Sequence, residues 1–322
     1  MKSAVLFASL FMLMPTFAQE SAPQIPFDSN PDFFQLPNDV HFGEASGVAV
    51  NSKGHVYVFS RGSTTGPAYG AAAAQVFEFD EKGKYIREVG KNLYAWSFAH
   101  AIRVDKQDNL WAIDKGSDMI IRFNPQGRVS MVFGRKKEAS DEAAPWTRVN
   151  PPRPPVDGQF RQPTDVTWDP QGNIYISDGY INSRVAKYDA NGDWVKSFGE
   201  PGNGPGQLNT PHSIAADAKG QIYVADRGNR RVQVFDADGN YVASWTDFGT
   251  SPDGIFIAAD DTMYVADVSM ESGGIRIASA RDGKVRETIT GARPEGLAVD
   301  SHGTIYSGET TSGRSLKVFA RP

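Results

Sequence analysis

The chain has 322 residues, 40% of them hydrophobic, and it contains no cysteine, so its fold cannot depend on disulfides. Its net charge of -5 leaves no basic footprint, which argues against a nucleic-acid partner. Its 32 glycines and 20 prolines are typical of an all-β protein with many turns.

The first residues have the pattern of an export signal. Residues 1–18 contain Lys2, an apolar run and the small-x-small sequence Thr16-Phe17-Ala18. The run is too short for a membrane span and no second run exists, so we expect a signal peptide cleaved near Ala18. This predicts an exported protein, periplasmic or extracellular, with an N-terminal extension at 19–32 and no membrane span.

The rest of the chain repeats one unit six times. Each unit opens with a short apolar strand: SGVAV (46–50), HAIRV (100–104), TDVTW (164–168), HSIAA (212–216), DGIFI (253–257) and EGLAV (295–299). A turn follows, then a second strand such as IYVAD, a third strand, another turn and a fourth strand. This pattern predicts an all-β, six-bladed β-propeller of four-stranded blades over 33–322. The segments 62–75 and 135–158 interrupt it and are expected to be surface loops.

The sixth unit lacks a fourth strand, because the chain stops after SLKVFARP. An unpaired edge would remain unless another segment covers it. The sequence PNDVHFGE (37–44) resembles DWVKSFGE (193–200), which ends a fourth strand. We therefore expect residues 33–43 to supply the missing strand and close the ring.

The starts of the innermost strands place three candidate metal ligands on the channel axis. His100, His212 and Glu295 begin this strand in the second, fourth and sixth units. Alternate blades point their side chains toward one another, and two imidazoles with a carboxylate form a set that holds catalytic zinc. The alternative is that the two histidines are merely solvated in a polar channel.

The loops after the second strands return to the same mouth of the channel. Arg61 and Tyr180 depart from the repeat at this position, which favours a functional role. The other basic residues expected there are Lys115, Arg184, Arg227 and Arg230. Arg184 and Arg230 recur between units and are interpreted as structural. Asp178, Asp226 and Asp267 also recur, and we expect them to bind backbone amides of loops.

Two resemblances follow from these motifs. GPGQLNTPHSI and VFDADGNYV resemble NHL repeats. The stretches VFSRG, AHAIRVD, RQPTDVTWDPQGNIYISDGYINSR and VADRGNRRVQ resemble the peptidyl-α-hydroxyglycine α-amidating lyases. That family is a six-bladed propeller that splits a C-terminal α-hydroxyglycine into a peptide amide and glyoxylate. The resemblance implies that His100 and His212 bind zinc and Tyr180 is the base. It also implies that Arg61 and Arg227 bind the substrate.

The chain departs from this family at several positions. The third histidine ligand of the family is replaced by Glu295, and the acidic residue that helps bind a structural calcium is Gly296. We therefore expect zinc on Glu295 and no calcium at Gly296. A cysteine pair of the family is replaced by Arg161 and Ile181. No copper hydroxylase sequence is present, so a hydroxylated substrate would come from an unknown partner.

Three functions fit the sequence. The first is a zinc-dependent lyase that acts on a small-molecule or peptide substrate at the mouth. The second is a non-catalytic exported propeller that binds a peptide, glycan or protein there, because fold alone does not decide function. The third is a calcium-dependent lactonase-like hydrolase. His100 and His212 argue against it, because imidazole suits zinc better than calcium.

Overall fold

The structure, a computed structural model, describes residues 22–23, 28–30, 32–40, 42–62, 74–136, 150–310 and 316–320. The predicted signal peptide at 1–18 lies outside the described residues. So do 63–73 and 137–149, which make up much of the two predicted insertions. Within the described ranges, no helix is long and apolar enough to span a membrane.

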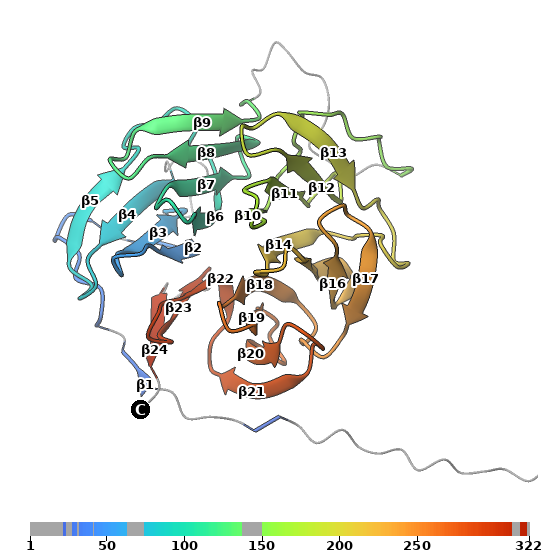
Figure 1. Cartoon of the computed structure of the whole chain (residues 1–322). Helices are drawn as coiled ribbons and strands as arrows, with labels where there is room; N and C mark the ends of the chain where they lie inside the picture. Colours follow the sequence, from blue (N-terminus) through green and yellow to red (C-terminus); the bar gives the residue numbers. More distant parts are fainter. Residues whose placement is uncertain are drawn as a thin grey trace, which may run out of the picture.

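The described chain forms six antiparallel sheets of four strands, arranged around a central axis (Figure 1). The prediction of an all-β, six-bladed propeller is therefore confirmed. The innermost strands are β2 (Ala45–Val50), β6 (Ala99–Val104), β10 (Asp165–Trp168), β14 (Pro211–Ala216), β18 (Pro252–Ile257) and β22 (Pro294–Val299). The second strands are β3 (Val56–Ser60), β7 (Leu110–Asp114), β11 (Ile174–Asp178), β15 (Ile222–Asp226), β19 (Thr262–Asp267) and β23 (Ile305–Glu309).

The outer half of each blade contains its third and fourth strands. The third strands are β4 (Gln75–Phe79), β8 (Met119–Phe123), β12 (Arg184–Tyr188), β16 (Arg231–Phe235), β20 (Gly274–Ser279) and β24 (Leu316–Ala320). The fourth strands are β5 (Tyr85–Val89), β9 (Val129–Phe133), β13 (Trp194–Phe198), β17 (Tyr241–Trp245), β21 (Val285–Thr290) and β1 (Asp28–Ser29). One 3₁₀ turn, η1 (Arg227–Asn229), follows β15.

The apolar core lies between neighbouring blades. The second strands β3, β7, β11, β15 and β23 are buried along their whole length, because each faces a neighbouring blade on both sides. Fourth strands such as β9 are largely exposed, and only the last residue of β9 is buried. This difference explains why the second strands read as continuous apolar runs, whereas the fourth strands carry charged residues.

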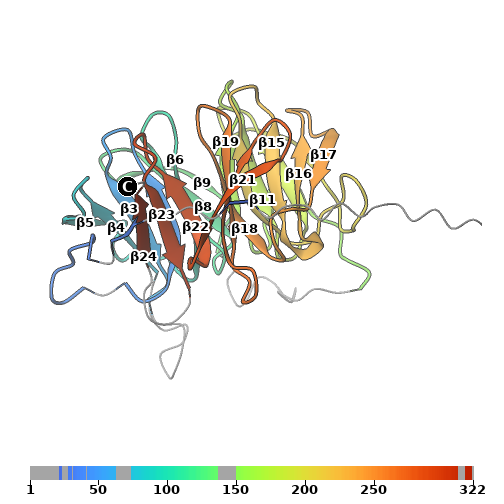
Figure 2. The ribbon, with the colours of Figure 1, turned by 90° about the horizontal axis from the view of Figure 1, so that it is seen from below.

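The turns between first and second strands are built on one acidic side chain. In blade three, Asp169 Oδ1 accepts hydrogen bonds from the amides of Gln171 (3.0 Å) and Asn173 (2.9 Å). Gly172 takes a φ of 85°, which only glycine adopts readily. Seen edge-on in Figure 2, the blades run between two faces of the ring. These turns therefore lie opposite the strand starts that carry the candidate ligands.

An N-terminal strand does close the ring, but not at the expected residues. β1 pairs with β24, so Asp28 and Ser29 complete the sixth blade. The prediction that 33–43 forms this strand is wrong. Val40 N donates to Pro37 O (3.0 Å), which makes a turn inside this segment. Its aromatic side chains instead pack against the core between blades six and one, where Phe34 lies 4.9 Å from Phe79.

Candidate metal centre and active site

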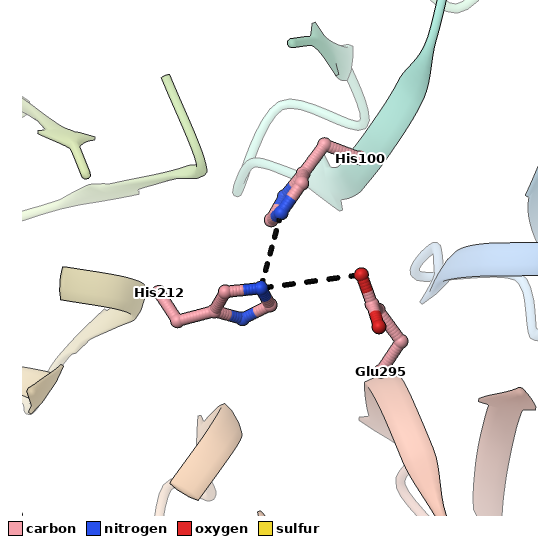
Figure 3. Close-up of side chains that lie close together, drawn as sticks. All are labelled: His100, His212 and Glu295. Atoms are coloured by element: carbon pink, nitrogen blue, oxygen red, sulfur yellow. Dashed lines mark hydrogen bonds and ion pairs between the residues drawn. The ribbon is translucent and has the colours of Figure 1, made fainter. Parts of the chain in front are cut away.

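The three predicted metal ligands begin the innermost strands of alternate blades, and each lies at a bulge. In β6, β14 and β22 the pairing register shifts across the position of His100, His212 or Glu295. A bulge releases one residue from the ladder and re-aims its side chain. Figure 3 shows the three side chains converging from separate strands. Their ligand atoms all lie within 4.8 Å of one another.

Acidic residues at the ends of the second strands hold these strand starts in place. In each ligand-bearing blade, the carboxylate accepts a backbone amide two or three residues before the ligand. The bonds join Phe98 N to Asp114 (3.0 Å), Asn209 N to Asp226 (2.7 Å) and Arg293 N to Glu309 (2.9 Å). Asp178 and Asp267 accept the amides of Arg161 (2.9 Å) and Ser251 (3.1 Å) in the same way. The prediction that the recurring aspartates bind loop amides is confirmed.

Both axial histidines are neutral and share one tautomer. His100 Nδ1 lies 2.6 Å from the carbonyl oxygen of Thr164, and His212 Nδ1 lies 3.1 Å from that of Asp253. A carbonyl oxygen only accepts, so each Nδ1 carries the proton and each Nε2 presents a lone pair. Burial lowers the pKa of both rings well below its usual value, with His212 adding to the effect on His100.

These two lone pairs face one another, an arrangement that calls for a cation. The Nε2 atoms are 3.2 Å apart. Tyr180 Oη lies 3.3 Å from one and 3.1 Å from the other, but its single proton can satisfy only one of them. Tetrahedral zinc with Zn–N bonds of about 2.0–2.1 Å sets neighbouring ligand atoms about 3.3 Å apart. The residues present therefore fit a zinc ion.

The Glu295 carboxylate lies farther from His212 Nε2 than His100 Nε2 does, and it forms an ion pair with Arg61. Its Oε1 accepts from Arg61 Nη2 at 2.6 Å and lies 3.9 Å from His212 Nε2. The Arg61 guanidinium holds the pKa of Glu295 well below its usual range, although burial opposes this. Arg293, two residues before Glu295, donates to the carbonyl of Val268. Glu295 is thus an ionised carboxylate within reach of a metal, and its role as a ligand stays a prediction.

The guanidinium nitrogens of Arg61 are largely occupied by contacts with other residues of the protein. Its side chain is 8% exposed, and Nε donates to Ala99 O at 2.8 Å. Its Nη1 lies 3.6 Å from Glu44 in addition to the bond between Nη2 and Glu295. The structure therefore places Arg61 beside the candidate metal ligands, where it forms ion pairs with Glu295 and Glu44.

Tyr180 lies directly over the two imidazoles but is not acidified by the surrounding protein. Burial raises its pKa to about 12, and Glu295 adds to this, whereas Arg227 and Arg61 lower it. Burial therefore outweighs the two arginines. The protein residues alone thus keep Tyr180 protonated at neutral pH.

Asp253 is a site residue that the sequence did not reveal. It begins the innermost strand of blade five, where its backbone carbonyl contacts His212. Its Oδ1 accepts from Arg227 Nη1 at 3.3 Å. The side chain is fully buried, and Oδ2 has no hydrogen-bond partner among the described residues. Its position at the start of the strand was the available signal, because that position carries the ligands in blades two, four and six.

A buried polar network fills the axis beyond the histidines. Arg103, three residues after His100, binds Asp165 and also donates to Ser213 Oγ (3.0 Å) and Ile255 O (3.1 Å). The network spans blades two to five and was not predicted. Its signal was a charged residue in two otherwise apolar innermost strands, a pattern that usually marks a paired buried charge.

Two other positions refine the sequence analysis. Arg184 is buried against Asp178 at 3.2 Å, as its structural interpretation required. Its counterpart in blade four is Arg231, which binds Asp226 at 2.7 Å, and not Arg230. A Cβ atom at Gly296 would lie 2.6 Å from the carbonyl oxygen of Ser46. The packing thus leaves no room for a carboxylate ligand at that position.

Fold and site together define an NHL-repeat β-propeller with a candidate axial metal centre. The sequence model of the NHL repeat matches residues 208–235. The fold is similar to that of a streptogramin B lyase structure, with a TM-score of 0.59, 14% identity, and coverage of 91% of this chain and 87% of that one. At this identity the likeness shows the fold alone.

The chain is related to amidating lyases and to an NHL-repeat protein. It is 26% identical to peptidyl-glycine alpha-amidating monooxygenase B of Xenopus laevis over 83% of this chain and 33% of the relative, so it spans about a third of that protein. It is 25% identical to a probable peptidyl-alpha-hydroxyglycine alpha-amidating lyase of Caenorhabditis elegans, over 86% of this chain and 82% of the relative. NHL repeat-containing protein 3 of Mus musculus is 32% identical over 62% of this chain and 54% of its own.

Proposed function

We propose that this protein is a zinc-dependent lyase that cleaves a C-terminal α-hydroxyglycine into an amide and glyoxylate. The observation that carries the proposal is the convergence of two neutral Nε2 atoms, 3.2 Å apart, beneath the Tyr180 hydroxyl. The relation to the amidating lyases supports the choice of reaction. The export segment proposed for residues 1–18 would place this reaction outside the cytoplasm.

The residues divide into three roles. His100, His212 and Glu295 would hold zinc, which when bound supplies Lewis acidity that lowers the pKa of a nearby substrate hydroxyl. Burial alone keeps Tyr180 protonated, but the charge of a bound metal would favour its ionised form. In that form Tyr180 Oη, 3.1 Å from His212 Nε2, is placed to accept the hydroxyl proton. Arg227, whose side chain is 24% exposed at the mouth, is placed to bind the substrate carboxylate.

The bond changes balance without an oxidant. Tyr180 accepts the proton of the hydroxyl, and the electron pair left on that oxygen forms the new C=O bond. The C–N bond breaks, and its electron pair goes to the amide nitrogen. The nitrogen takes a proton back from Tyr180, so the products are a primary amide and glyoxylate, and Tyr180 returns to its ionised form.

A direct assay tests this proposal. Purified protein is loaded with zinc and supplied with N-benzoyl-α-hydroxyglycine, and glyoxylate release is followed with and without a chelator. We expect release that the chelator abolishes and that zinc restores. Metal-loaded protein that produces no glyoxylate above the spontaneous rate would refute the reaction.

One observation favours the alternative of a non-catalytic binding propeller. The Glu295 carboxylate is bound to Arg61 at 2.6 Å and is not aimed solely at the histidines. Under this alternative, the mouth binds a peptide, glycan or protein and needs no metal. Zinc-free protein that binds such a partner as tightly as zinc-loaded protein would support the alternative over the lyase.

A further inference from the structure

Three basic residues at the channel mouth occupy the same position of the repeat, so Arg61 does not depart from the repeat as the sequence predicted. Arg61, Lys115 and Arg227 each follow the last residue of a second strand, in blades one, two and four. They alternate with aromatic rings. Arg61 and Lys115 both lie 4.6 Å from the centre of the Phe98 ring, and Lys115 lies 4.0 Å from that of Tyr180. Arg227 lies 5.3 Å from the Tyr180 ring.

These three cations differ in what neutralises them. Arg61 is paired with Glu295 and lies near Glu44, and Arg227 is paired with Asp253. In the part of the chain that the structure describes, the Lys115 ammonium contacts two aromatic rings and forms no ion pair with an acidic residue. A half-buried cation without a counter-ion is costly unless a ligand supplies one. Lys115 therefore leaves a place for an anion beside Tyr180.

We propose that Lys115 and Arg227 form the carboxylate-binding subsite of the mouth, and that Arg61 serves Glu295 instead of the substrate. This inference rests on the proposed lyase function and names the substrate class that the site accepts, molecules with a free carboxylate next to the reacting carbon. Both cations lie against the ring of Tyr180, so a carboxylate bound by them lies beside the proposed base. The sequence resemblance assigned this task to Arg61 and Arg227.

The test compares an acid with its ester. N-benzoyl-α-hydroxyglycine and its methyl ester are assayed with wild type, Lys115→Met, Lys115→Arg and Arg61→Met. We expect Lys115→Met to raise KM for the acid about ten- to a hundredfold, the value of a charged hydrogen bond, and to change KM for the ester little. Lys115→Arg should recover most of the loss. The matched control is Lys187→Met, which removes a lysine that also lies over a tyrosine ring, 5.3 Å from Tyr175.

Two results would overturn the subsite. One is an equal effect of Lys115→Met on acid and ester, and the other is a selective loss for the acid in Arg61→Met but not in Lys115→Met. A binding measurement separates this inference from the proposed reaction. N-benzoylglycine lacks the hydroxyl and cannot react. A wild type that releases no glyoxylate, and yet binds N-benzoylglycine about tenfold more tightly than Lys115→Met does, would support the subsite and refute the reaction. Equal or absent binding refutes the subsite.

Discussion

At the scale of single residues, the mouth of the channel is a set of opposed charges around two neutral imidazoles. Arg61 faces Glu295, and Arg227 faces Asp253. Both carboxylates are buried or nearly so, and the loss of an arginine would leave the charge of its partner uncompensated. The Tyr180 hydroxyl contacts both imidazoles, which makes it the group whose removal should affect chemistry more than folding.

We expect Tyr180→Phe to keep the fold and the bound metal while turnover falls. Loss of a general base typically lowers the rate by about 10²–10⁴-fold. Glyoxylate release, zinc content and the thermal midpoint of unfolding are measured on the same preparation. Full activity in the variant would remove Tyr180 from catalysis, because the ring and its packing are unchanged and only the hydroxyl is lost.

Glu295 should contribute to metal affinity directly. Glu295→Gln is expected to weaken zinc binding by about 10–100-fold, and Glu295→His should restore it with a third imidazole. Zinc titration of both variants checks this, with His100→Ala as the reference for a lost ligand. Unchanged zinc affinity in Glu295→Gln would assign the carboxylate to Arg61 alone, as a structural ion pair.

At the scale of elements, the site depends on how each innermost strand starts. The bulges at His100, His212 and Glu295 aim the ligands, and the carboxylates at the ends of the second strands fix the preceding residues. Asp226 is the acid of this kind in the blade that carries His212. It accepts from Asn209 N, Asn229 Nδ2, Arg231 Nε and Gln233 Nε2.

We expect Asp226→Ala to destabilise the protein by about 3–5 kcal/mol, because it removes a fully buried carboxylate and leaves the largely buried Arg231 without its acidic partner. Zinc affinity should also fall, because the start of the His212 strand loses its anchor. The control is Asp236→Ala, which removes a partly exposed turn aspartate of the same blade and should cost at most about 1.5 kcal/mol. Denaturant unfolding and zinc titration measure both effects. Equal losses in the two variants would contradict the anchoring role.

Much of this arrangement was accessible from the sequence, because strand period and turn residues repeat in every unit. The repeat placed His100, His212 and Tyr180 at one mouth, and the structure brings them within 3.3 Å of one another. The repeat could not reveal with which acidic residue each arginine forms an ion pair. The Arg61–Glu295 pair joins residues 234 positions apart, and side-chain pairing over such a span depends on the closed ring.

At the scale of the whole molecule, the ring closes where blade six meets blade one. The closing strand β1 has only two residues, and aromatic side chains of the following segment pack against both blades. Phe34 lies near the rings of Phe33, Phe42 and Phe79. The sequence prediction misplaced the closing strand because the segment 33–43 resembles other fourth strands. The apolar residues of that segment instead form this aromatic packing.

We therefore expect the aromatic packing to stabilise closure more than the strand does. Phe34→Ala should cost about 2–3 kcal/mol of unfolding free energy, at the low end for a buried phenylalanine because the side chain is partly exposed. Removal of the chain through Ser29 should cost about 1–2 kcal/mol, the value of a few backbone hydrogen bonds. The reverse order, measured by denaturant unfolding, would make the strand the main closure.

The most direct test of this account is the zinc content of the purified protein. Wild type, His100→Ala and His212→Ala are dialysed against buffered zinc, and bound metal per chain is measured by elemental analysis. The account predicts about one zinc per chain in wild type, because the two Nε2 lone pairs face one another, and a large loss in each variant. Wild-type protein that retains no metal, or variants that bind zinc as tightly as wild type, would contradict it.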